Sequence, residues 1–132
     1  MLSVLVVEDE PDLGAMMAQL LEMEGYRPVL ATDGVEALAH ARAERFDIVL
    51  SDLMMPNMDG PSLLRALRDH GVAPACFILM TALPESVARR ECPEADAHLM
   101  KPFPFDDLLT ILATCQQRIA TQAAVVPLRR TS

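Results

Sequence analysis

The sequence lacks an uninterrupted apolar run long enough to cross a bilayer, although 52% of its 132 residues are apolar. Its three cysteines form no Cys-x-x-Cys pair and have no ligand-like spacing to its three histidines, which argues against a zinc domain. The first residues carry no basic leader and run directly into Glu8-Asp9-Glu10, unlike a secretory signal. From these absences we expect a soluble, cytoplasmic chain with no membrane partner.

Positive charge is also scarce, since 11 Lys and Arg residues face 19 Asp and Glu residues and give a net charge of −8 at pH 7. A negative surface repels phosphate backbones, so direct nucleic-acid binding is disfavoured and a basic partner or a bound cation is favoured. The apolar fraction is too high for a disordered chain. The length is typical of one globular domain, and the sequence shows no internal repeat.

Short apolar runs alternate with helical patterns along the whole chain. Strands are predicted over residues 3–7, 28–31, 47–51, 75–81 and 96–100. Helices are predicted between Pro11 and Gly25, over 35–43, between Pro61 and Gly71, in a short segment 85–92, and over 105–119. Strict alternation requires right-handed crossovers, which predict a doubly wound α/β domain with five parallel strands and helices on both faces. In such sheets the functional crevice lies beyond the carboxyl ends of the strands.

Polar side chains stand at the carboxyl ends of four predicted strands: Glu8 and Asp9 follow the first, Asp52 the third, Thr81 ends the fourth and Lys101 follows the fifth. Parallel strands end at one edge of the sheet, so these side chains are expected to meet. Two like charges about 4 Å apart repel by roughly 4 kcal/mol at an effective dielectric constant of about 20. Three carboxylates against one lysine therefore predict a bound cation, and oxygen-only ligands suit Mg2+.

A carboxylate beside such a cation can attack phosphorus, and Asp52 is the best candidate nucleophile. Thr81 and Lys101 are expected to bind the phosphoryl oxygens, since they offer a hydroxyl donor and a compact positive charge. The metal ligands would be Glu8, Asp9, Asp52 and the backbone carbonyl of Met54. Any one strand-end acid is usually only a solvated loop residue, so the prediction depends on the whole set. No organic cofactor is expected.

The sequence resembles the response-regulator receiver domain of two-component signalling, in the stretches around Glu8-Asp9, Asp33-Gly34, Asp52 to Gly60, Thr81-Ala82 and Lys101-Pro102-Phe103. The resemblance covers residues 1 to about 118. It implies a flavodoxin-like fold with strand order 2-1-3-4-5, with a domain over 1–120 followed by a disordered tail over 121–132. It also implies that Asp52 accepts a phosphoryl group from a histidine kinase or a histidine phosphotransfer protein.

Further roles follow from the same resemblance. Mg2+ would be held by Asp9, Asp52 and the Met54 carbonyl, with Glu8 acting mainly through water, and the Lys101-Pro102 bond would be cis. The signal would pass to an unidentified downstream protein when Thr81 moves inward and a residue three positions before the lysine rotates. That residue is His98 here, where the family more often has Tyr or Phe.

The segment between Thr81 and Lys101 is shorter than is usual in the family. Pro84 and Pro93 flank the predicted helix at 85–92. A shortened or irregular fourth helix is therefore expected. Because receivers usually dimerise or contact targets through this face, a homodimer of the common kind is left open.

Several functions remain open at this level. The leading hypothesis is a phosphoacceptor that signals by surface change and is no enzyme beyond Mg2+-dependent self-phosphorylation and autodephosphorylation. The sequence does not separate this role from that of a phosphate shuttle or a phosphate sink, and a receiver fragment of a longer regulator is a further alternative. A Mg2+-dependent aspartyl-phosphate phosphatase of the haloacid-dehalogenase type is a remote alternative, because Asp52 follows the third strand and its +2 residue is Met54. A protein-binding domain that is not phosphorylated is disfavoured, because no member of the acid, threonine and lysine set is missing.

Overall fold

Five parallel strands form one sheet in the order β2-β1-β3-β4-β5 in the computed structural model of the chain, which describes residues 1–131 and the side chains of residues 1–122. The strands are β1 (Ser3–Val7), β2 (Arg27–Ala31), β3 (Ile48–Asp52), β4 (Cys76–Thr81) and β5 (Ala97–Met100). The helices are α1 (Pro11–Met23), α2 (Gly34–Ala43), α3 (Gly60–Asp69), α4 (Glu85–Glu91) and α5 (Phe105–Thr131). The predicted doubly wound, flavodoxin-like fold and its strand order are confirmed.

The three central strands are buried along their whole length, which explains their continuous apolar sequences. Every residue of β1, β3 and β4 is buried. A strand covered by helices on both faces cannot alternate apolar and polar side chains. The edge strands β2 and β5 are less buried, and their sequences are correspondingly less apolar.

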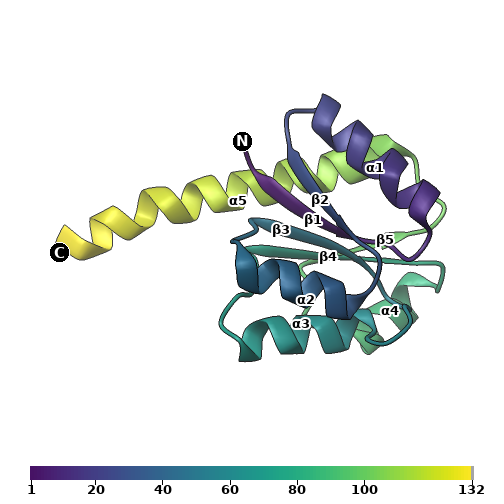
Figure 1. The fold of residues 1–132 in the computed structure, drawn as a ribbon. Helices are drawn as coiled ribbons and strands as arrows, with labels where there is room; N and C mark the ends of the chain where they lie inside the picture. The colour runs from purple at the N-terminus through teal and green to yellow at the C-terminus, as the bar shows by residue number, and fades with distance from the viewer. Residues whose placement is uncertain (132) are drawn as a thin grey trace. The chain divides into compact units, whose positions relative to one another are not determined.

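Helices α2 and α3 lie on one face of the sheet and α1 lies on the other, as Figure 1 shows. The main core joins strand residues such as Leu5 and Phe77 to Ala37 of α2 and Leu63 of α3. On the other face, α1 packs closely on β2, because a Cβ added at Gly14 would lie 2.7 Å from Leu30 Cδ1. Helices packed on both faces therefore hold the strands, and the strands hold the loops at their ends.

Helix α4 is short, as predicted, with seven residues from Glu85 to Glu91. Pro84 occupies its N-cap, where a side chain that could accept a hydrogen bond is missing. The helix ends where the Cys92 N–H bonds to the Ala88 carbonyl. Its one buried residue is Ala88, so little of this helix is held by the core.

Helix α5 belongs to a second compact unit that begins at Phe103, and we describe it by itself. It continues to Thr131, whereas the sequence predicted an end near residue 119 and a frayed tail over 121–132. The chain beyond residue 119 offers no glycine and no proline before Pro127, so nothing local ends the helix earlier. Ser132 lies outside the described residues, and the division of the chain at residue 120 stays a prediction. Every helix in the described part of the chain is too short or too polar to span a membrane.

Candidate functional site

The register of the sheet brings the predicted site residues to one edge. Val7 pairs with Ser51, and Asp52 pairs with Met80. Thr81 pairs with Met100, the residue before Lys101. Glu8, Asp52, Thr81 and Lys101 therefore all stand at the carboxyl ends of adjacent strands, as the sequence predicted, although they come from distant parts of the chain.

Lys101 joins two of these strand ends directly. Its Nζ lies 2.7 Å from Glu8 Oε1 and 2.6 Å from Asp52 Oδ1. The Glu8 side chain is 0% exposed and that of Asp52 is 6% exposed, whereas that of Lys101 is 24% exposed. The lysine backbone is held as well, because its N–H donates to the Thr81 carbonyl at 2.7 Å, and the Lys101-Pro102 bond is cis.

Each buried carboxylate keeps one oxygen free of the lysine. Glu8 Oε2 and Asp52 Oδ2 are buried without a hydrogen-bond partner among the described residues. Asp9 lies beside them and is exposed, and one oxygen from each of the three acids can be chosen so that all lie within 4.8 Å of one another. A buried polar atom without a partner is costly, so these oxygens indicate that something else binds there.

The pKa values in the pocket reflect the excess of negative charge. Burial, followed by the neighbouring Glu8 carboxylate, raises the pKa of Asp52 to about 8. Burial opposes ionisation of Glu8 too, but its interactions with Asp52 and with Lys101 outweigh burial and lower the pKa of Glu8. Burial would lower the pKa of Lys101, yet the two carboxylates raise it. The lysine thus stays charged, and ionisation of Asp52 is disfavoured when no cation is bound.

The donor set fits a small divalent cation. All three side chains offer carboxylate oxygens, the ligands that Mg2+ prefers, and the exposed Asp9 leaves the cluster open to water. A cation would satisfy the unpartnered oxygens of Glu8 and Asp52 and would favour the ionised form of Asp52. These residues could therefore hold a metal ion.

Thr81 and Met54 lie at the predicted strand end and in the predicted loop. The hydrogen bond of the Thr81 side chain is with its own loop. The Thr81 side chain is buried, and its Oγ1 accepts a hydrogen bond from the Leu83 N–H at 3.0 Å. Its hydroxyl proton remains available for an oxygen at the sheet edge. Met54 stands two residues after Asp52 with 73% of its surface exposed. The role of its backbone carbonyl as a metal ligand stays a prediction.

His98, the predicted switch residue, lies in the middle of β5 opposite Leu79. The ring is half-buried, and its Nε2 lies 2.9 Å from the carbonyl oxygen of Cys92 at the end of α4. A carbonyl only accepts, so Nε2 carries the proton in this contact. In this position the ring links β5 to the end of the short helix, and its role as a switch stays a prediction.

Sequence reasoning missed a set of contacts that fixes the loop after Asp52. The Asn57 side-chain amide donates to Asp33 Oδ2 at 2.9 Å, although the two residues lie in different loops. Asn57 also has a positive φ of 71°. The only sequence signals were two turn-like stretches, Asp33-Gly34 and Pro56 to Gly60, and a turn composition does not reveal which loops touch.

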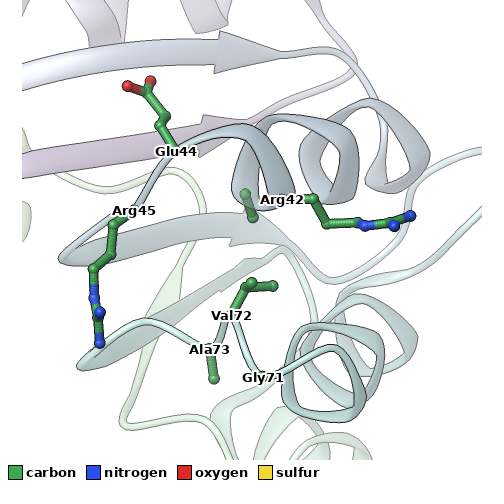
Figure 2. A pocket seen from close by; sticks show the side chains of 7 residues that line it. Arg42, Glu44, Arg45, Gly71, Val72 and Ala73 are labelled. Carbon is green, nitrogen blue, oxygen red and sulfur yellow. The ribbon is translucent and has the colours of Figure 1, made fainter.

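A small pocket lies at the opposite edge of the sheet, away from the acids and the lysine. It has a volume of about 250 Å3 and is lined by residues that follow α2 and α3, including Arg42, Arg45 and Val72. Figure 2 shows the side chains of Arg42 and Arg45 pointing in different directions. The two guanidinium groups do not converge on one ligand, so the acid and lysine cluster is the better site.

A doubly wound sheet in this order, with acids after β1 and β3 and a lysine after β5, defines a receiver-type α/β domain. The family model described as "Response regulator receiver domain" matches residues 4–113, and the chain belongs to this family. It is thus a receiver domain of two-component response regulators.

Individual relatives agree with this assignment. The chain is 33% identical to the transcriptional regulatory protein PcoR of Escherichia coli over 124 residues, which cover 93% of this chain and 55% of PcoR. The Francisella response regulator 1452 receiver domain has a TM-score of 0.82 and 30% identity, over 90% of this chain and 99% of that one. TrrA of Thermotoga maritima, solved in complex with Mg(2+)-BeF, has a TM-score of 0.77 and 30% identity, over 87% and 99%. The chain spans about half the length of the first curated relatives it matches.

Proposed function

We propose that this chain is a phosphoacceptor, in which Asp52 receives a phosphoryl group from a histidine kinase or a histidine phosphotransfer protein with the help of Mg2+. The observation that carries the proposal is the geometry of Asp52. Lys101 holds one of its carboxylate oxygens at 2.6 Å, while the other oxygen is buried without a partner beside Glu8 and Asp9. Such an acid has one neutralised oxygen and one oxygen open to a cation or an electrophile.

The reaction is a transfer of a phosphoryl group between two nucleophiles. The P–N bond of a phosphohistidine, or the P–O bond of an acyl phosphate, breaks with its electron pair staying on the donor. A new P–O bond forms to a carboxylate oxygen of Asp52. Lys101 and the Thr81 hydroxyl would then bind oxygens of the transferred group, and hydrolysis would return free Asp52 and inorganic phosphate.

Glu8, Asp9, Asp52 and the Met54 carbonyl are the residues that would hold Mg2+. When bound, Mg2+ neutralises charge that develops on the phosphoryl oxygens. The chain's own part is to orient Asp52 against Lys101 and to leave its second oxygen beside Glu8 and Asp9. Because the pKa of Asp52 is raised to about 8 without a cation, the acid needs the positive charge nearby before it can act as a nucleophile at neutral pH.

This reading makes the chain no enzyme beyond its own phosphorylation and dephosphorylation. Membership of the receiver family leaves the haloacid-dehalogenase type of phosphatase without support. The phosphorylated form would signal to an unidentified protein by a change of surface that involves Thr81 and His98. A phosphate shuttle, a phosphate sink, a receiver segment of a longer regulator and a homodimer are compatible with the same chemistry. A cytoplasmic location, where a histidine kinase could reach it, is part of the proposal.

The test is to incubate the chain with acetyl phosphate, with and without Mg2+, and to measure its intact mass. We expect one added phosphoryl group that depends on Mg2+ and none in Asp52→Asn, which keeps the shape and loses the nucleophile. Asp47→Asn is a matched control, since Asp47 is an acid at the opposite end of β3 that accepts hydrogen bonds from Ser3. Labelling that persists in Asp52→Asn would place the acceptor elsewhere.

A further inference from the structure

The loop that joins β3 to α3 carries the proposed acceptor at its start and is tied to the chain at both ends. After Asp52, the Leu53 N–H donates to the Met80 carbonyl at 2.8 Å and so continues the sheet. At the other end the Asp59 carboxylate caps α3 by accepting from the Ser62 N–H at 2.8 Å. Between these ends the Gly60 N–H donates to the Leu53 carbonyl at 2.8 Å, and the loop has one further support.

That support comes from the junction between β2 and α2. The Asn57 amide donates to Asp33 Oδ2 at 2.9 Å, while Asp33 Oδ1 accepts from the Glu36 N–H at 2.8 Å. One oxygen of the Asp33 carboxylate therefore caps α2, and the other holds the loop. These two hydrogen bonds lower the pKa of Asp33, so the acid is ionised at neutral pH and accepts from both.

The backbone at Asn57 has a positive φ, which is uncommon for a residue other than glycine. Its φ is 71°, and the Met58 N–H bonds to the Pro56 carbonyl at 2.8 Å, which makes a three-residue turn centred on Asn57. Turns of this kind with positive φ are rare and strained. Strain of this size persists where surrounding contacts enforce it, and such places cluster at functional sites.

A close backbone approach enforces the same arrangement. A Cβ added at Gly34 would lie 2.7 Å from Met58 Cβ and 2.8 Å from its carbonyl oxygen. The start of α2 thus fits against the loop only because residue 34 has no side chain. The hydrogen bond from Asn57 and the contact at Met58 fix two consecutive loop residues against one helix end.

We propose that Asn57 and Asp33 are positioning residues for the site, and that their hydrogen bond holds the loop so that Asp52 and the Met54 carbonyl can bind Mg2+ together. The proposal deepens the function proposed above and depends on its metal site. Neither residue belongs to the acidic cluster that could hold the metal. Their effect passes through the loop backbone, as outer partners of metal ligands commonly act.

Two variants separate positioning from folding. Asn57→Gly keeps access to a positive φ and removes only the amide. Asp33→Ser keeps a good N-cap for α2 and removes the second oxygen. Arg27→Ala is the matched control, because Arg27 on β2 forms an exposed 3.3 Å pair with Glu44 at the other end of α2.

The chain has no tryptophan, so the dissociation constant for Mg2+ is best measured by calorimetry, with thermal unfolding in EDTA as the folding control. We expect each variant to raise this dissociation constant about 10-fold. The Asn57→Gly/Asp33→Ser double variant should be no weaker than either single variant, since both remove one hydrogen bond. Arg27→Ala should bind as the wild type does. Labelling by acetyl phosphate at limiting Mg2+ should slow in parallel.

An unchanged dissociation constant in Asn57→Gly overturns the proposal, and so do additive effects in the double variant. Should Asp33→Ser fail to fold, Asn57→Gly alone decides. If wild-type protein takes no phosphoryl group, the function proposed above fails, while the calorimetric comparison still tests the positioning role.

Discussion

Lys101 lies 93 residues from Glu8 in the sequence, yet its Nζ donates to Glu8 Oε1 at 2.7 Å. The same ammonium group reaches Asp52, so one positive charge joins the ends of β1, β3 and β5. Two buried carboxylates share this charge, and a third, exposed one lies beside them. The metal-free pocket therefore sets three acidic groups against a single lysine.

Removal of the lysine should destabilise the fold. Lys101→Met leaves Glu8 and Asp52 without their cationic donor, and hydrogen bonds to charged groups contribute about 2 kcal/mol. We expect a loss of this size in the free energy of unfolding measured in urea without metal. Arg89→Met, which breaks the exposed pair with Glu85, should change the same quantity by less than about 0.5 kcal/mol. Equal losses in the two variants would contradict the central role of Lys101.

The stability of the metal-free protein should fall as the pH rises. The pKa of an unperturbed aspartate carboxyl is 3.8, whereas that of Asp52 in the folded chain is about 8. The folded state therefore binds this proton more tightly than the unfolded state. The contribution of Asp52 is fully present below a pH of about 4 and is lost as the pH approaches about 8. The pKa of Glu8 is lowered, so its contribution to stability is lost only in the acid range. The pKa of Lys101 is raised, so its contribution is lost only in the alkaline range.

Urea denaturation in EDTA across this pH range measures the effect. The difference in stability between wild type and Asp52→Asn should shift in favour of the variant as the pH rises, because asparagine does not titrate. A difference that stays constant with pH would show that Asp52 has an ordinary pKa.

Magnesium should stabilise the fold through Asp9. A ligand at ten times its dissociation constant adds about 1.4 kcal/mol to the free energy of unfolding. Asp9→Asn should remove most of this gain, since the exposed carboxylate completes the cluster. Glu10→Gln is the matched control at the next exposed acid and should keep the gain. A melting shift in Asp9→Asn as large as in wild type would refute the metal assignment.

The backbone next to the acceptor should not tolerate a side chain at residue 60. A Cβ at Gly60 would lie 2.7 Å from the Asp52 carbonyl oxygen and 2.7 Å from Leu79 Cδ1. We expect Gly60→Ala to cost about 1 to 3 kcal/mol, as overpacking does, and to weaken Mg2+ binding by displacing Asp52. Gly25→Ala has a positive φ but open space around it, so it should lose stability with no change in Mg2+ affinity.

The sequence allowed the strands and the strand-end residues to be predicted because both depend on local patterns. The runs around Val6 and Leu50 are mainly apolar, as strands buried on both faces are, and parallel strands place their ends at one edge. Glu8, Asp52 and Lys101 followed from that rule. The short α4 was readable from Pro84 and Pro93.

Other features could not be read in this way, since they depend on distances between loops. No pattern states that Lys101 is shared by two acids rather than paired with one. The contact between Asn57 and Asp33 joins two turn-like stretches whose compositions predict only turns. Helix α5 continues past the end predicted near residue 119, because residues 120–126 contain no glycine or proline.

Lys101 is also the only lysine among the 132 residues. An amine-selective reagent therefore meets just two primary amines in this chain, the exposed terminus at Met1 and the ε-amino group in the pocket. While carboxylates hold that group it should react far more slowly than the terminus. The ratio of modification at the two amines then reports, without any added label, whether the lysine remains engaged.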